Sequence, residues 1–316
     1  MYIKTINTRE IIDDSSFRFS DRRDISSLYS SIKNSGLIAP PCAAPKKEGF
    51  QLISGFSRFE ASVNAGLNSI PVRIKPEDIS LSQVFYNEVE AHSVNRKFTL
   101  TEKARILKIV TELDVREHEL AAFCRLIDLP EERGVIEKTV EILNFTDDVQ
   151  NYIGMYDLSL KQTAMFKGLS DQEQILFMDL AKRLHIRGVE LGKIIELVQD
   201  ISGRTGEQAE RILKRAEKNK PEFYENRNQA LAHLKEELQR LRFPKMTQIN
   251  NDLTKRRKMI KGSGGIKFEW DRTLENPGIL ISAKIKSSKD TDRILSVISD
   301  ESNRKVLNQM LEIIVP

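Results

Sequence analysis

The chain has 316 residues, a formal net charge of +4, 40% hydrophobic residues and 30% charged residues. This length predicts two or three domains, and no apolar run approaches the about 20 residues of a membrane span or forms the core of a secretory signal. The two cysteines and four scattered histidines lack metal-ligand spacing. We therefore expect no metal centre and no membrane contact, and a reduced, cytoplasmic setting.

The first part of the chain mixes short β-type runs with helices. The spacing of apolar residues predicts a helix over residues 24–36 that ends at Gly36. Further on, a strand ending at Ile53 leads into Gly55, a helix over 59–65 and a strand over 70–74. A turn that opens a helix offers free N–H groups and a positive dipole end to an anion, which Arg58 could also grip. From the residues alone, a plain salt bridge of Arg58 stays open as the alternative.

The order of residues in this stretch resembles a known family. The pattern G-E-R-R-x-x-A followed by A-G-x-x-x-I-P-V is matched by Gly55, Arg58, Ala61, Ala65, Gly66, Ile70, Pro71 and Val72. It resembles the N-terminal domain of the ParB partition family, which shares its small α+β fold with sulfiredoxin. The resemblance implies a CTP site, with the nucleotide-binding candidates Gly36, Gly55, Phe56, Ser57, Arg58, Asn95 and Arg96.

The chain departs from the family pattern at its acidic positions. Phe56 and Ser57 stand where the family has Glu and its first Arg, and the family box E-N-x-Q-R falls on residues 92–96, where only Arg96 is kept. In the family the acidic residue of that box holds a divalent cation. Two alternatives follow for the cofactor, CTP with Mg²⁺ or none. The catalytic residue is unknown, and the nearest carboxylate to the glycine turn is Glu60.

Beyond residue 97 the pattern becomes helical. Helices predicted over 117–128 and 132–143, joined by a short break, suggest a helix-turn-helix. The resemblance to ParB continues here to about Val198 and implies DNA contacts by Arg133, Lys138, Lys161 and Gln162. The alternative is a helical bundle that has lost or changed the DNA site, because acidic residues share the exposed face of the second helix.

A basic arm and a small mixed segment complete the chain. From Arg204 to Lys267 there are 17 Lys and Arg against 8 Asp and Glu, and the excess peaks at Lys255, Arg256, Arg257 and Lys258. This cluster predicts binding to nucleic acid. Strands over 266–270 and 279–285 and two helices form a ββα unit that is small for a stable core, so it favours pairing with a second copy.

The sequence thus predicts an α+β protein with four segments. These are a small ParB/sulfiredoxin-like α+β domain (1–97), an all-α helix-turn-helix domain (98–200), a basic helical linker (201–265) and a ββα dimerisation-like domain (266–316). The function that this implies is that of a homodimeric ParB-like protein. It would bind double-stranded DNA in chromosome or plasmid partition, or in related DNA organisation, be gated by CTP and associate with the nucleoid.

Other readings stay open. One alternative is a nucleotide-dependent enzyme of the ParB/sulfiredoxin superfamily, such as a hydrolase, kinase or nuclease, including a weak CTPase. Another is an interaction adaptor without a ligand. A ParA-type ATPase is an uncertain partner, because the family engages it through an arginine-bearing N-terminal tail and only Lys4 and Arg9 lie near this N-terminus.

Overall fold

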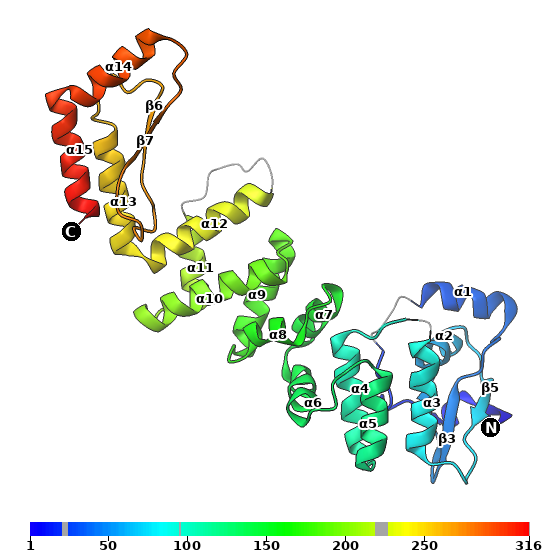
Figure 1. Cartoon of the computed structure of the whole chain (residues 1–316). Coiled ribbons are helices and arrows are strands. Elements are labelled where there is room, and N and C mark those ends of the chain that lie inside the picture. Colours follow the sequence, from blue (N-terminus) through cyan, green and yellow to red (C-terminus); the bar gives the residue numbers. More distant parts are fainter. Residues whose placement is uncertain (21–24, 95, 219–226, 316) are drawn as a thin grey trace. The chain divides into compact units, whose positions relative to one another are not determined.

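The computed structural model describes all residues except 21–24, 95, 219–226 and 316. The chain forms two compact units, residues 1–192 and residues 193–316, which run from blue to green and from green to red in Figure 1. Both units combine helices with a sheet, so the predicted α+β class is confirmed. The finer division into four segments stays a prediction.

The sheet of the first unit has the strand order β1-β5-β3-β4-β2. Neighbours pair antiparallel in β1–β5 and β3–β4, and parallel in β3–β5 and β2–β4. In this register Cys42 lies opposite both Ser54 and Arg73, which places these three residues side by side across three strands. The strands are β1 (Tyr2–Asn7), β2 (Ile11–Ile12), β3 (Cys42–Lys46), β4 (Gly49–Ser54) and β5 (Ser69–Ile74).

Helix α2 follows directly on strand β4 and begins earlier than predicted. Gly55 adopts the left-handed conformation (φ 84°, ψ 25°) as the N-cap, so the helix starts at Phe56 and not at residue 59. Its buried residues are Phe56, Phe59, Ala61 and Ser62, whereas Val63 is 45% exposed. The neighbouring helical elements are η1 (Thr8–Glu10), α1 (Ser26–Ser35), α2 (Phe56–Asn64) and α3 (Leu81–Ser93).

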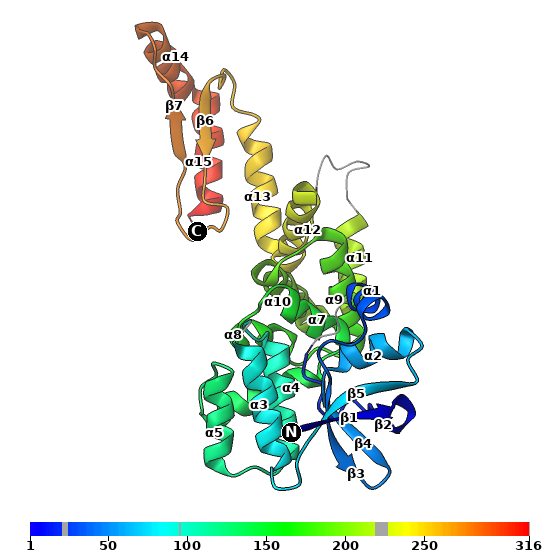
Figure 2. The ribbon, with the colours of Figure 1, turned by 90° about the vertical axis from the view of Figure 1, so that its right-hand side faces the viewer.

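The apolar core of the sheet continues into the helices α4 (Leu100–Glu112) and α5 (Glu117–Leu126). The rings of Phe85 in α3 and Phe123 in α5 pack with centroids 5.8 Å apart, and Leu107 of α4 is fully buried in the same cluster. Figures 1 and 2 show α3, α4 and α5 side by side. One continuous core therefore links the sheet to the first helices of the predicted helix-turn-helix region.

The remaining helices of the first unit begin at regular capping boxes. Ser159 with Gln162, and Ser170 with Glu173, satisfy the free N–H groups at the starts of α8 and α9. The predicted helix pair appears as α5 and α6, each shorter than expected by about one turn or less. The elements are α6 (Arg133–Val140), η2 (Glu141–Asn144), α7 (Asp147–Met155), α8 (Leu160–Thr163), η3 (Ala164–Phe166), α9 (Asp171–Leu184) and α10 (Gly188–Thr205).

The second unit contains the predicted ββα arrangement with one helix more than expected in its core. Strands β6 and β7 pair antiparallel, and Leu253 of α13 packs in the same apolar cluster as Phe268 and Met310. The arm therefore contributes α13 to the C-terminal core. The elements are α11 (Ala209–Lys218), α12 (Arg227–Arg242), α13 (Pro244–Arg257), β6 (Ile266–Glu269), β7 (Leu280–Ala283), α14 (Ser288–Ser299) and α15 (Glu301–Ile314).

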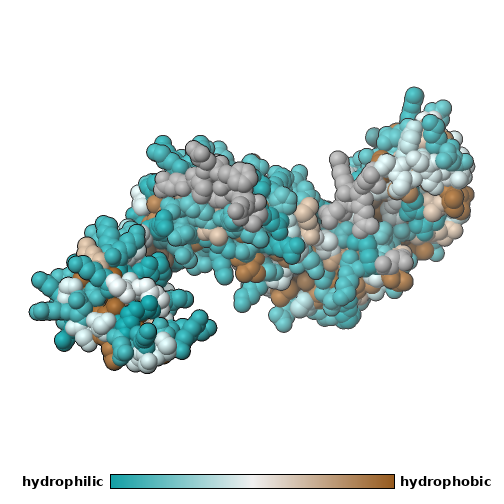
Figure 3. Space-filling model, turned by 90° about the horizontal axis from the view of Figure 1, so that it is seen from above, coloured by the Kyte–Doolittle hydropathy of each residue, from teal (hydrophilic) through white to brown (hydrophobic). Residues whose placement is uncertain are grey.

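The surface seen in Figure 3 is mainly hydrophilic, with scattered apolar residues. Within the described part of the chain, none of the helices combines the length and apolar character that crossing a membrane requires. The predicted strands and helices thus fold into units with polar exteriors and apolar cores.

Candidate functional site

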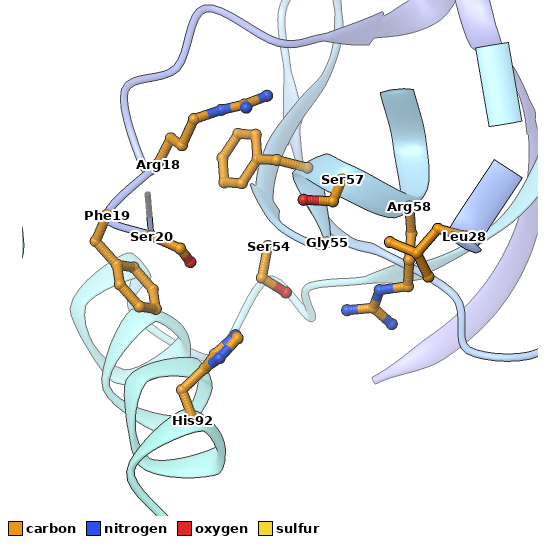
Figure 4. Close-up of a pocket in the computed structure, with 10 residues that line it drawn as sticks. Arg18, Phe19, Ser20, Leu28, Ser54, Gly55, Ser57, Arg58 and His92 are labelled. Atoms are coloured by element: carbon orange, nitrogen blue, oxygen red, sulfur yellow. The ribbon is translucent and has the colours of Figure 1, made fainter. Parts of the chain in front are cut away.

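A cavity of about 210 Å³ opens at the start of α2. It is bounded by the end of β4, the first turn of α2, α1, α3 and the segment before residue 21 (Figure 4). Segments far apart in the sequence thus meet around the predicted glycine turn. The lining residues are Arg18, Phe19, Ser20, Leu28, Ser54, Gly55, Phe56, Ser57, Arg58 and His92.

Both the backbone conformation at position 55 and the neighbouring atoms require glycine there. Its φ of 84° lies in the left-handed region, as predicted from the sequence. A Cβ atom at this position would lie 2.8 Å from both Cα and Cβ of Pro41, and 3.1 Å from Nη2 of Arg58. The backbone can therefore approach Pro41 only without a side chain, and this close approach shapes the wall of the cavity.

Among the described residues, Arg58 forms no ion pair with a carboxylate. Its Nη1 donates to the carbonyl oxygens of Ala39 at 2.8 Å and Pro40 at 3.4 Å. Burial, and next the positive charge of Arg73, lower the pKa of the Arg58 guanidinium. The charge of a bound anion beside Arg58 would offset both effects, and the anion site at Arg58 stays a prediction.

A buried ionic network lies directly beneath the cavity. Glu88 of α3, 7% exposed, accepts a hydrogen bond from Ser54 Oγ at 2.6 Å and pairs with Arg73 Nη2 at 2.8 Å. Burial, followed by the negative charge of Glu88, raises the pKa of the Cys42 thiol to about 12. Cys42 therefore stays protonated and unreactive, and the network fixes Ser54 at the floor of the cavity.

Six of the lining residues were not among the nucleotide-binding candidates, and His92 and Arg18 are two of them. His92 packs edge-on against Phe19 with centroids 5.2 Å apart, and burial, followed by the charge of Arg96, lowers the pKa of its imidazole. Arg18 lies over the ring of Phe56 at 4.8 Å and pairs with Asp13 at 3.0 Å. No sequence motif joins these positions, since they meet only through the tertiary fold.

Other nucleotide-binding candidates lie outside the cavity lining. Gly36 follows α1 with a φ of 74° and donates to Ile32. The Arg96 guanidinium forms a bidentate ion pair with the Glu102 carboxylate, at 2.5 and 2.8 Å. The charge of Arg96 is therefore neutralised by Glu102. Asn95 lies outside the described residues. The catalytic candidate Glu60 is about half exposed, 3.8 Å from Arg18, and does not line the cavity.

The four DNA-binding candidates of the first unit do not all lie in one place. Lys138 and Lys161 line one groove of about 720 Å³ formed by α6, η2, α8 and η3, and Lys167, which sequence reasoning had not identified, joins them. Arg133 is exposed at the start of α6 and bonds to Glu137 at 2.8 Å. The Gln162 side chain is used in the capping box of α8. The structure thus brings together two of the four candidates.

The four basic candidates of the second unit cluster at the end of α13 and just beyond it. Lys255 is 3.9 Å from Asp252, and Arg256 donates to Gln309 at 2.6 Å. Arg257 lines a hollow of about 360 Å³ together with Trp270 and Arg272. Arg256 is thereby fixed against the C-terminal core, while Lys255 and Lys258 remain exposed.

Comparison with known proteins supports a specific family. Residues 2–86 match the model of the ParB N-terminal domain. The chain is 20% identical over 165 residues to a probable chromosome-partitioning protein ParB of Pseudomonas putida, covering 50% of this chain and 54% of the relative. It is 22% identical over 172 residues to the chromosome-partitioning protein ParB of Caulobacter vibrioides, covering 53% and 54%. The match thus spans about half the length of each relative.

Two solved structures are similar to the chain. Both are C-terminally truncated ParB from Caulobacter crescentus, one complexed with CTP-gamma-S and one with the centromeric parS site. Each is 16% identical, with 57% and 61% of this chain and 98% and 97% of the other chain covered, and TM-scores of 0.27 and 0.28. Residues 2–86 are thus similar to the ParB N-terminal domain, and about half of the chain is similar to the two ParB relatives.

Proposed function

We propose that this chain is a DNA-binding protein of chromosome or plasmid partition whose N-terminal cavity binds CTP. The observation that carries the proposal is the cavity at the start of α2, inside the ParB-like residues, where Arg58 forms no ion pair with a carboxylate of the described residues. A helix start and a guanidinium together favour a phosphate group. The proposed ligand is further supported by the relative whose structure contains CTP-gamma-S.

The groove that contains Lys138, Lys161 and Lys167 is the proposed DNA contact of the first unit. Exposed lysines bind the phosphate backbone by releasing counterions, and this binding weakens steeply with salt. Acidic neighbours compete with the phosphates, since Lys167 lies 3.5 Å from Glu141. The cluster Lys255–Lys258 adds a second basic surface. The relative complexed with the parS site supports duplex DNA as the partner.

A homodimer is proposed through the C-terminal ββα segment. Strand β7 is exposed along its whole length, including Leu280 at 64%, and Leu295 of α14 is 58% exposed. Apolar residues of this size would be covered by a second copy of the same segment. The proposal places the protein in the cytoplasm, associated with the nucleoid, and does not include a ParA-type ATPase.

Enzymatic turnover is not part of the proposal. Hydrolysis of a triphosphate usually needs a carboxylate that places a cation or orients water. Glu60 lies outside the cavity lining, and none of the described lining residues carries a carboxylate. The role proposed for the cavity is therefore binding.

Isothermal titration of the full chain with CTP, ATP, GTP and UTP tests the nucleotide part. We expect saturable binding of CTP, and Arg58→Ala should weaken it by about 1.5–3 kcal/mol, the range for a charge-assisted hydrogen bond. Arg9→Ala, an exposed arginine of the same unit, is the matched control and should leave it unchanged. If the Arg58 and Arg9 variants bind CTP with equal affinity, CTP does not bind in this cavity.

Fluorescence anisotropy with duplex DNA across a salt series tests the DNA part. We expect a steep decrease in affinity with salt, and replacement of Lys255–Lys258 by glutamates should flatten the slope. Absent or salt-independent binding by the wild-type chain would discard the proposed partition function.

A further inference from the structure

The proposed nucleotide cavity is lined by cations and hydroxyl groups. Its charged lining residues are Arg18 and Arg58, its hydroxyls belong to Ser20, Ser54 and Ser57, and none of the described lining residues carries a carboxylate. Nucleotide sites usually hold Mg²⁺ with one or two carboxylates together with the phosphates. The donor set of this cavity therefore does not fit the Mg²⁺ ion that the ParB resemblance implies.

Two carboxylates of the described residues near the cavity, Glu88 and Asp13, are already engaged in ion pairs. Glu88 accepts from Ser54 at 2.6 Å and from Arg73 at 2.8 Å, so its charge is neutralised beneath the floor. Asp13 pairs with Arg18 at 3.0 Å. Throughout the part of the chain that the structure describes, no group of three or more His, Cys, Asp and Glu residues is arranged to hold a metal ion. Recruiting Glu88 to a cation would require breaking a buried ion pair.

Positive groups occupy the place where a cation would be needed. Arg58 uses Nη1 on the carbonyls of Ala39 and Pro40 and forms no ion pair with a described carboxylate. The N-cap of α2 is Gly55, which has no side chain, so the first N–H groups of this helix have no side-chain cap. Ser57 lies in that first turn and lines the cavity. Arg58 and Ser57 line the same cavity, so they and the first amides of α2 are the candidate donors to an anion in it.

We infer that this cavity binds the phosphates of a nucleoside triphosphate directly, without a bridging divalent cation. Arg58, the Ser57 hydroxyl and the first amides of α2 supply the hydrogen bonds and the positive charge that a metal ion would otherwise provide. The inference rests on the proposed function, because it takes CTP as the ligand of this cavity.

Calorimetric titration of the wild-type full chain with CTP, once in EDTA and once in MgCl₂, tests the inference. We expect the two affinities to agree to within about tenfold, which corresponds to 1.4 kcal/mol. Binding that is at least about tenfold tighter in MgCl₂ overturns the inference and leaves the proposed function standing. Absence of binding in both arms overturns the proposed nucleotide function, so the two failures can be distinguished.

A pair of substitutions at one position provides an independent test. Ser57→Asp places a carboxylate beside the proposed phosphate, so its affinity for CTP in EDTA should fall by about tenfold or more and recover in MgCl₂. Asparagine has the size of aspartate but no charge, so Ser57→Asn should bind CTP with the same dependence on Mg²⁺ as the wild-type chain. Thermal melting verifies that both variants fold. Unchanged binding of folded Ser57→Asp in EDTA would show that no phosphate lies at Ser57 and would overturn the inference.

Discussion

Arginine plays different parts in the cavity and on the helix-turn-helix surface. Arg58 is half-buried and, within the described residues, donates to the carbonyl oxygens of Ala39 and Pro40, whereas the side chain of Arg133 is 92% exposed and bonds to Glu137. Exposed ion pairs contribute little energy, because water screens them. If DNA binds Arg133, it must replace the local ion pair, whereas an anion at Arg58 would meet a cation that forms no ion pair with a described carboxylate. The proposed nucleotide site would thus need less rearrangement of ion pairs than the proposed DNA surface.

The largest effect should come from the glycine that shapes the cavity. Gly55→Ala should lower the free energy of unfolding by about 3 kcal/mol, because the new Cβ atom combines a left-handed backbone with a clash at Pro41. Gly66→Ala is the matched control. Gly66 also has a positive φ, of 78°, but open space around it, so its cost should be about 1 kcal/mol. Equal losses in urea denaturation would contradict the close approach at Pro41.

The ion pair under the cavity should have the next largest effect. Glu88→Gln keeps the size of the side chain and removes the charge opposite Arg73, and should cost about 2 kcal/mol of unfolding free energy, less than a fully buried pair because Arg73 is partly exposed. Glu90→Gln changes an exposed residue of the same helix and should be neutral. Chemical denaturation of both variants measures the difference, and a neutral Glu88→Gln would refute a structural role for the network.

A smaller effect is expected for DNA binding by an exposed lysine of the proposed DNA groove. Lys161→Ala should weaken binding of duplex DNA by about 0.5–1 kcal/mol and lower the salt slope by about 1, as for one phosphate contact. Lys108→Ala, an exposed lysine of α4 outside the groove, should change neither quantity. Anisotropy titrations at several salt concentrations give both values, and identical behaviour of the two variants would exclude the groove as a DNA contact.

The smallest effect concerns pH. The pKa of His92 is lowered from 6.5 in the folded chain by burial, then by Arg96, while Glu88 and Glu102 act in the opposite direction and Arg58 adds to the lowering. The unfolded chain therefore binds the proton more readily, so stability is complete above pH 6.5 and decreases as the pH falls below it. His92→Gln should reduce this pH dependence, and the exposed control His118→Gln should not. Melting curves at several pH values would falsify this if the two variants behave alike.

The sequence predicted the local features of the cavity well. Positive φ at Gly55, the helix behind it and the strand over residues 70–74 all follow from short-range rules of backbone conformation and periodicity, and the structure confirms them. The start of α2 was less predictable. Spacing of apolar residues alone did not include Phe56, which enters the core only because the helix begins immediately after the glycine.

The remainder of the cavity could not be predicted because tertiary contacts create it. His92 and Arg18 are isolated residues in the sequence, and they reach the cavity through the packing of α3 and of the segment before residue 21. Arg96 illustrates the opposite case. It matches a family position, yet its charge is taken by Glu102 six residues away, a pairing that depends on the geometry of the α4 N-terminus.

The continuous core of the sheet, α4 and α5 determines where the protein can be divided for experiments. A fragment ending at residue 97 would separate the ring of Phe85 from that of Phe123 and leave an apolar face bare, so we expect it to aggregate when expressed. A fragment ending at Thr205 retains that contact and keeps α10 whole, the helix in which the division between the two units falls. We expect it to elute as a single species in gel filtration and to retain whatever affinity for CTP the full chain has.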